Sequence, residues 1–96
     1  MKEQYRKKPR QGEIWKHFKS KYYLILNVDV IHSETGEILI VYQALYDTFK
    51  IYARPVQMFM SEVDLKKYPC AKQKYRFEKF ADSLSEYGKY FSGESN

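Results

Sequence analysis

A short polar stretch between two long apolar runs is the feature that most constrains the fold of this chain. The stretch covers residues 32–37, and Gly36 within it can adopt the positive φ that a tight chain reversal requires. The runs on either side, 22–31 and 38–46, are rich in β-branched and aromatic residues, as strands are. Together the three segments predict one β-hairpin in the middle of a small, mainly β domain.

The two runs differ in their patterning. In 22–31, every second position from Tyr22 to Val30 is apolar, which predicts one continuous apolar face on a half-buried strand. The run 38–46 is apolar on both faces except at Gln43, so we expect it to be the central, most buried strand.

Shorter elements are expected around the hairpin. The alternation in 13–18 predicts an edge strand, and 51–54 predicts a strand that stops at Pro55, which cannot donate to a ladder. Because proline is favoured at the first position of a helix, a helical turn is expected near 55–60. Two more strands are expected at 61–65 and 73–77, with a loop at 66–72 between them.

The pattern changes at the C-terminal end. Apolar residues at helical spacing predict an amphipathic α-helix over 78–91, weakened by Gly88. The residues at this spacing are Phe77, Phe80, Ala81, Leu84, Tyr87 and Phe91.

These elements predict a small β-barrel of about five strands, because closing the sheet removes the unpaired edges that short strands would leave. We divide the chain into a flexible basic arm (1–11), the β-barrel domain (12–77), the helix (78–91) and a disordered tail (92–96). Ninety-six residues are enough for one domain with a modest core.

Composition limits the classes of protein further. One cysteine excludes a disulfide framework, and no apolar run approaches the length of about 18 residues that a membrane span needs. The first residues lack the apolar segment of a signal peptide, so we expect a cytoplasmic protein without a membrane partner. The net charge is +5, with the basic residues gathered in 1–23 and 64–80. Such flanks suit either nucleic acid or simple solubility.

Several blocks follow one another in an order that resembles the bacterial domain of unknown function 1653 family. They are His17-Phe18-Lys19, Tyr23, the stretch 32–37, 41–46, Arg54-Pro55 with Met58-Phe59, and Arg76-Phe77. The resemblance covers about residues 12–77 and implies a fold of the SH3-like barrel type, without an established activity. Ser20 stands where the family usually has glycine, and the helix expected at 78–91 lies outside the family domain.

The leading hypothesis for function is a non-enzymatic binding module with a groove of aromatic, arginine and histidine side chains. Arg54 ends a strand among tyrosines, where a guanidinium suits a carboxylate, a phosphate, a base or a peptide. Alternatively, Arg54 pairs with Glu34, Glu37 or Asp47 and only fixes the hairpin. The candidate ligand-binding residues are His17, His32, Glu34, Tyr42, Tyr46 and Arg54. The ligand would be an unidentified small molecule, peptide or protein.

A second hypothesis is the binding of single-stranded nucleic acid, RNA in particular. Basic and aromatic residues alternate in 74–77, as they do in proteins that stack bases and contact phosphates. An alternating edge strand gives the same pattern without a ligand. The candidate residues are Lys16, Lys19, Lys74, Tyr75 and Arg76.

A third hypothesis is an enzyme that uses His17, His32 and Glu34. These three residues could also form a two-histidine, one-carboxylate metal site, but their spacing matches no compact metal motif, so we expect no metal. Cys70 follows Pro69 in a loop without an obvious activating neighbour. We therefore assign no catalytic residue and expect no cofactor.

Overall fold

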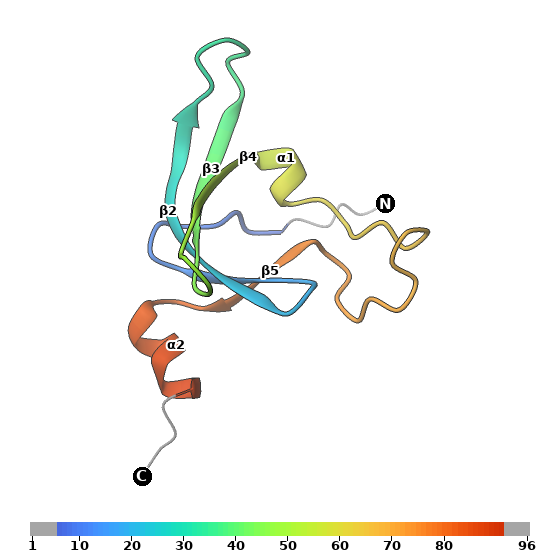
Figure 1. Ribbon diagram of the computed structural model, residues 1–96. Helices are drawn as coiled ribbons and strands as arrows, with labels where there is room; N and C mark the ends of the chain where they lie inside the picture. Colours follow the sequence, from blue (N-terminus) through green and yellow to red (C-terminus); the bar gives the residue numbers. More distant parts are fainter. Residues whose placement is uncertain (1–5, 92–96) are drawn as a thin grey trace.

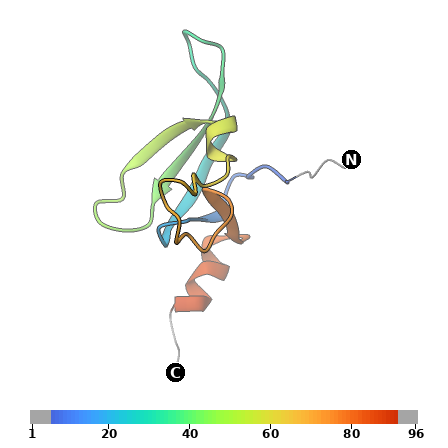
Figure 2. The same ribbon diagram turned by 90° about the vertical axis from the view of Figure 1, so that its right-hand side faces the viewer.

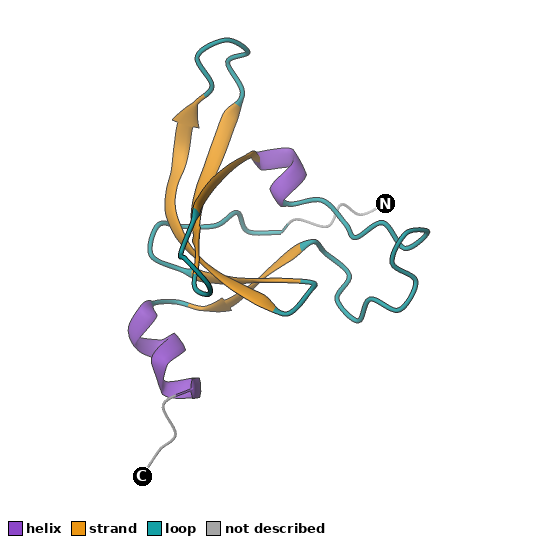
Figure 3. Ribbon diagram, in the orientation of Figure 1, coloured by secondary structure: helices purple, strands orange, loops and turns teal. Residues whose placement is uncertain are grey.

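The computed structural model describes residues 6–91, which form one five-stranded antiparallel sheet and two short helices (Figures 1 and 3). The strand order is β4-β3-β2-β1-β5, so β2 is the middle strand, and β3, expected to be the central and most buried strand, is an inner strand with a larger share of buried residues than β2. The prediction of a mainly β fold is confirmed. The elements are β1 (Ile14–His17), β2 (Lys21–Ile31), β3 (Ile38–Ala44), β4 (Ile51–Pro55), α1 (Val56–Phe59), β5 (Phe77–Ala81) and α2 (Leu84–Phe91).

The β2–β3 hairpin is the longest feature of the sheet and extends beyond the other strands (Figures 1 and 2). In its turn, the backbone N–H of His32 donates to the carbonyl of Glu37 at 2.8 Å, and that of Gly36 donates to the carbonyl of His32 at 2.9 Å. Gly36 has a φ of 78°. Because L-residues with a side chain are strained at this φ, the glycine sets the turn, as predicted.

A bulge in β2 changes which of its faces points to the core. Tyr23 and Ile25 are buried, but the pairing register with β3 shifts on both sides of Asn27, and beyond it Val28 packs against the core. The prediction of one continuous apolar face from Tyr22 to Val30 was therefore wrong, because a bulge inserts a residue and exchanges the two faces.

The core lies between the concave face of the sheet and α1. Its central contact is between Phe59 of α1 and Phe77 of β5, whose rings are parallel to within 7° with centroids 4.1 Å apart. Neither side chain is exposed by more than 1%. The buried core cluster contains Trp15, Tyr23, Ile25, Ile40, Tyr42, Ala44, Phe59 and Phe77.

The sheet is not closed into a barrel by hydrogen bonds, because β4 and β5 are its two outer strands and do not pair. We call the boundary between them the seam. Across the seam, the N–H of Arg76 donates to the carbonyl of Ser61 and the N–H of Val63 donates to that of Lys74, both at 2.9 Å. These bonds and a single bridge between residues 62 and 75 replace the strands expected at 61–65 and 73–77.

The boundary between strand and helix at the C-terminal end differs from the prediction. The expected C-terminal helix is present as Leu84–Phe91, but it begins later than residue 78, because Phe77–Ala81 form β5 and extend the sheet beyond residue 77. Phe77 and Ala81 face the core, whereas Phe80 points to the other face and contacts Tyr22 and Tyr87. Because apolar residues lie on both faces of this strand, their spacing in the sequence matches that of an amphipathic helix. The tail predicted to be disordered, 92–96, lies outside the described residues.

The N-terminal segment from Arg6 onward is packed on the domain, so the prediction of a flexible arm over 1–11 was wrong for residues 6–11. The guanidinium of Arg6 donates to the carbonyls of Met60 at 2.8 Å and Phe77 at 2.6 Å, and it lies 3.6 Å from the ring centroid of Tyr75. Pro9 is buried. Since Met60 follows α1 and Phe77 begins β5, Arg6 connects the two sides of the seam.

We expect Arg6→Met to lower the free energy of unfolding by about 2 kcal/mol, because hydrogen bonds to a charged donor contribute roughly 1.5–3 kcal/mol. For a domain of this size the loss corresponds to a fall in Tm of roughly 10 °C. Thermal unfolding followed by circular dichroism measures it. The control is Lys7→Met, which removes an exposed neighbouring charge. Equal Tm values for the two variants would contradict the role given to Arg6.

Candidate functional site

His17 is the last residue of β1 and lies half-buried at the seam. Its ring packs against Phe18, at 4.5 Å between centroids, and edge-on against Phe77 at 4.9 Å. The following turn brings the backbone N–H of Lys19 to 3.1 Å from Nδ1 of His17, to which it donates. Because Nδ1 is the acceptor, the proton of the neutral ring is on Nε2, which is left as a hydrogen-bond donor.

The turn after His17 contains Ser20, which adopts a positive φ of 67°. Its backbone N–H donates to the carbonyl of His17 at 2.8 Å. A positive φ at this position explains why a glycine would fit here, and it shows that serine adopts the same turn at some cost in backbone strain.

Arg54 lies on β4, immediately before Pro55. Its Nε donates to the hydroxyl of Tyr42 at 3.1 Å, and its Cζ is 5.9 Å from the centroid of Phe77. Within residues 6–91, the ion pairs closer than 4.0 Å join Lys79 to Glu13 and Asp82 and involve no arginine. The alternative in which Arg54 pairs with a carboxylate of the hairpin is therefore not observed.

Arg76 lies on the other side of the seam, directly before β5. Its Nε donates to Oγ of Ser61 at 3.2 Å, and its carbonyl accepts from the backbone N–H of Phe18 at 3.0 Å. These bonds fix the segment next to the end of β1. Arg76 thus lies near His17 although 59 positions separate the two residues in the sequence.

The electrostatics show that these cations act on the same imidazole. Burial and, in decreasing order, the positive charges of Arg54, Lys19 and Arg76 together lower the pKa of His17 to about 4. His17 is therefore neutral near pH 7. We call His17, Arg54 and Arg76 the arginine–histidine cluster.

Tyrosine side chains border the arginine–histidine cluster. The hydroxyls of Tyr23 and Tyr46 are 2.7 Å apart and share a hydrogen bond, and Nζ of Lys21 lies 4.8 Å from the ring centroid of Tyr46. Burial raises the pKa of Tyr23, and its hydrogen bond to Tyr46 raises it further. Tyr23 therefore stays protonated.

The structure brings together only part of the predicted ligand site. Tyr42, Tyr46, His17 and Arg54 lie around the core rings of Tyr23 and Phe77. His32 and Glu34 do not join them, since both lie in the β2–β3 turn, where the N–H of Glu34 donates to Nδ1 of His32 at 3.1 Å.

The geometry contradicts the hypothesis of an enzyme that uses His17, His32 and Glu34 together. His17 pairs with the first residue of β2, and His32 follows its last, so a strand of about 30 Å or more separates them. Among residues 6–91, no three histidine, cysteine or carboxylate side chains gather as a metal site would require.

The residues proposed for nucleic-acid binding do not form one surface either. Lys19 and Arg76 lie at the arginine–histidine cluster, but Lys16 is on the opposite face, with its Nζ 5.9 Å from the ring centroid of Tyr22. The ring of Tyr75 is covered by Arg6, and Nζ of Lys74 lies 5.4 Å from its centroid. Tyr75 therefore cannot offer that ring face to a base.

Two residues of the site were missed as site residues, Tyr23 and Phe77. Tyr23 contacts Tyr42 and Tyr46, and Phe77 contacts His17 and Tyr42. The alternation of Tyr23 with Ile25 indicates a second buried face of the strand, from which Tyr23 could have been predicted. Phe77 could not, because it begins a strand, whereas its spacing to the next apolar residues is also typical of a helix.

Comparisons with known proteins agree on one family. The family model described as "Protein of unknown function (DUF1653)" matches residues 13–79. The chain is similar to a protein of this family from Bordetella bronchiseptica whose crystal structure is known, with 26% sequence identity and a TM-score of 0.62. The match covers 78% of this chain and 90% of that chain. No curated protein matches. In the described part of the chain, no helix is long and apolar enough to cross a membrane.

We expect His17 to titrate with a pKa of about 4 and Arg54→Met to raise that pKa towards 6.5, because the substitution removes a neighbouring positive charge. Its folded-state pKa lies below the unfolded value, so the stability it contributes is complete above pH 6.5 and is lost as the pH falls towards 4. The measurement is the ring Cε1–H chemical shift against pH. His32 is the only other histidine and serves as the internal control. A His17 curve that is identical in both proteins would contradict the proximity of Arg54.

Proposed function

Because the chain belongs to the DUF1653 family, a family of unknown function, its role has to be inferred from its own side chains, and we propose that it is a non-enzymatic module that binds an anion at the arginine–histidine cluster. The anion is a phosphate or carboxylate group of a larger ligand. One observation carries the proposal. Two partly buried guanidinium groups lie near one neutral imidazole, and within residues 6–91 neither has a carboxylate closer than 4.0 Å.

Guanidinium groups suit this role because they present several N–H donors in a plane that matches the oxygens of carboxylates and phosphates. Nε of each arginine is already used, by Tyr42 for Arg54 and by Ser61 for Arg76. These bonds orient the side chains and leave the terminal nitrogens as donors. The arrangement supports an anion that bridges the two sides of the seam.

The neutral groups of the site also support binding over catalysis. His17 has its Nδ1 lone pair occupied by the Lys19 N–H and carries its proton on Nε2, so it donates and has no free lone pair to act as a base. Tyr23 has a raised pKa, the opposite of what a catalytic base or nucleophile needs. Nε2–H of His17 would add a hydrogen bond to an anion.

Single-stranded RNA is a weaker candidate. The phosphates of RNA would suit the two arginines. However, Tyr75, the residue expected to stack on a base, has one ring face covered by Arg6. A strong dependence of affinity on salt, with a steep slope that reports several phosphate contacts, would favour RNA over a small anionic ligand.

The test is isothermal titration of the full chain with inorganic phosphate and with citrate, near pH 7. We expect saturable binding by the wild type and a loss of at least tenfold, about 1.4 kcal/mol, in Arg54→Met and in Arg76→Met. Lys72→Met is the matched control, because it removes one exposed charge elsewhere. Absence of saturable binding, or equal weakening by Lys72→Met, would overturn the proposal. Melting curves of each variant establish that the fold is retained.

A further inference from the structure

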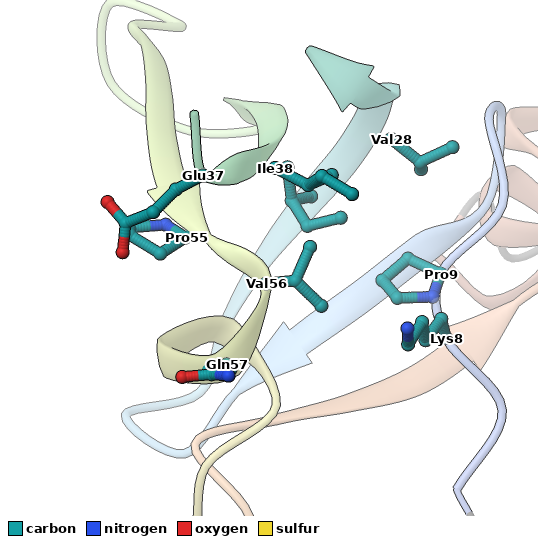
Figure 4. A pocket seen from close by; sticks show the side chains of 9 residues that line it. Lys8, Pro9, Val28, Glu37, Ile38, Pro55, Val56 and Gln57 are labelled. Carbon is teal, nitrogen blue, oxygen red and sulfur yellow. The ribbon is translucent and has the colours of Figure 1, made fainter. Parts of the chain in front are cut away.

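Two adjoining hollows lie away from the arginine–histidine cluster and meet at Lys8. The first has a volume of about 410 Å³ and lies between the β2–β3 hairpin, the start of α1 and the N-terminal segment (Figure 4). The second has a volume of about 400 Å³ and lies between that segment and β5. Lys8 lines both, and we call the combined surface the Lys8 groove.

The first hollow is apolar. In Figure 4, Ile38 and Val56 point towards the side of the hollow where Pro9 lies, and Val28, Glu37 and Gln57 also line it. Ile38 is 49% exposed. Covering such surface releases roughly 25 cal/mol for each Å², so the hollow favours a ligand with aliphatic side chains.

The second hollow is basic. Lys7, Lys8 and Arg10 line it, and within residues 6–91 none of their side-chain cations forms an ion pair closer than 4.0 Å. The carboxylates that line the hollow, Glu13 and Glu78, are outnumbered by its five cationic side chains, and Glu13 is buried and bound by three groups. It accepts from the Arg10 backbone N–H and from Nε1 of Trp15, both at 2.9 Å, and pairs with Lys79 at 3.4 Å. The hollow therefore has a charge that an acidic ligand would balance.

We propose that the Lys8 groove binds an extended peptide segment of a partner protein that carries apolar side chains next to acidic ones. The apolar side chains enter the hollow at Ile38 and Val56, and the acidic side chains lie along Lys7, Lys8 and Arg10. Each hollow alone has the size of a small-molecule site, and a ligand that fills both has to extend across Lys8. This proposal does not rest on the arginine–histidine cluster, which shares no lining residue with the groove.

A peptide fits this groove better than a nucleic acid does. The apolar hollow is lined by aliphatic side chains and proline and offers no aromatic ring on which a base could stack. In the basic hollow the indole of Trp15 is only 3% exposed. Phosphates could satisfy the charges of the second hollow but would leave the first one empty.

The fluorescence of Trp15, the only tryptophan of the chain, gives a direct readout because the residue lines the basic hollow. The full chain is titrated with a synthetic peptide of three leucines followed by four glutamates. The control peptides are the four glutamates alone, and three leucines followed by four lysines. We expect saturable binding of the first peptide, at least tenfold weaker binding of the glutamates alone, and none of the lysine peptide.

Two variants locate the binding surface. Lys8→Glu and Ile38→Asp should each weaken the first peptide at least tenfold, while Lys72→Glu, an exposed charge reversal elsewhere, should leave it unchanged. Circular dichroism melting checks that the variants fold. Absence of saturable binding, equal affinity for the glutamates alone, unchanged affinity in Lys8→Glu, or tighter binding of an oligouridine than of the peptide would each overturn the proposal.

Discussion

The stacked rings of Phe59 and Phe77 hold together the two sides of a sheet that hydrogen bonds do not close. β4 and β5 are the outer strands, and α1 follows β4 directly, so the stack joins the end of one outer strand to the start of the other. Both side chains are fully buried. Removing such a ring typically costs 3–5 kcal/mol, a large share of the stability of a domain of this size.

The same contact positions the candidate binding groups. Arg76 directly precedes Phe77, and the Cζ of Arg54 lies 5.9 Å from the Phe77 ring. The ring of His17 packs on the edge of Phe77. Each guanidinium is also oriented by a hydrogen bond from its Nε, to Tyr42 for Arg54 and to Ser61 for Arg76. Preorganised donors bind an anion without the cost of ordering their side chains first.

Local patterns in the sequence were sufficient for the hairpin, for its turn at Gly36, and for the helical turn after Pro55. Elements whose faces are both covered were not predictable in the same way. In β5, Phe77 and Ala81 face the core and Phe80 faces α2, and this spacing of apolar residues is shared by a strand and a helix. The bulge in β2 and the hydrogen bonds of Arg6 arise from tertiary packing, so no local sequence pattern predicts them.

The candidate site was predictable to a similar extent. Arg54 and the tyrosines beside it lie on paired strands, so hairpin register alone brings Tyr42 near Tyr52 and Arg54. Arg76 reaches the same place only through the bonds across the seam, which link segments without a regular strand pattern. His32 is not a partner of His17, because the two residues lie at opposite ends of the long strand β2. Composition does not reveal that distance.

The central claim is that the two arginines bind an anion across the seam, and the most direct measurement is anomalous diffraction from crystals soaked in selenate, a tetrahedral anion that stands in for phosphate. The account predicts a selenium peak between the guanidinium groups of Arg54 and Arg76, in hydrogen-bond contact with both, and no peak there in crystals of Arg54→Met. Selenate bound only at surface lysines, or a peak that persists in Arg54→Met, would contradict it.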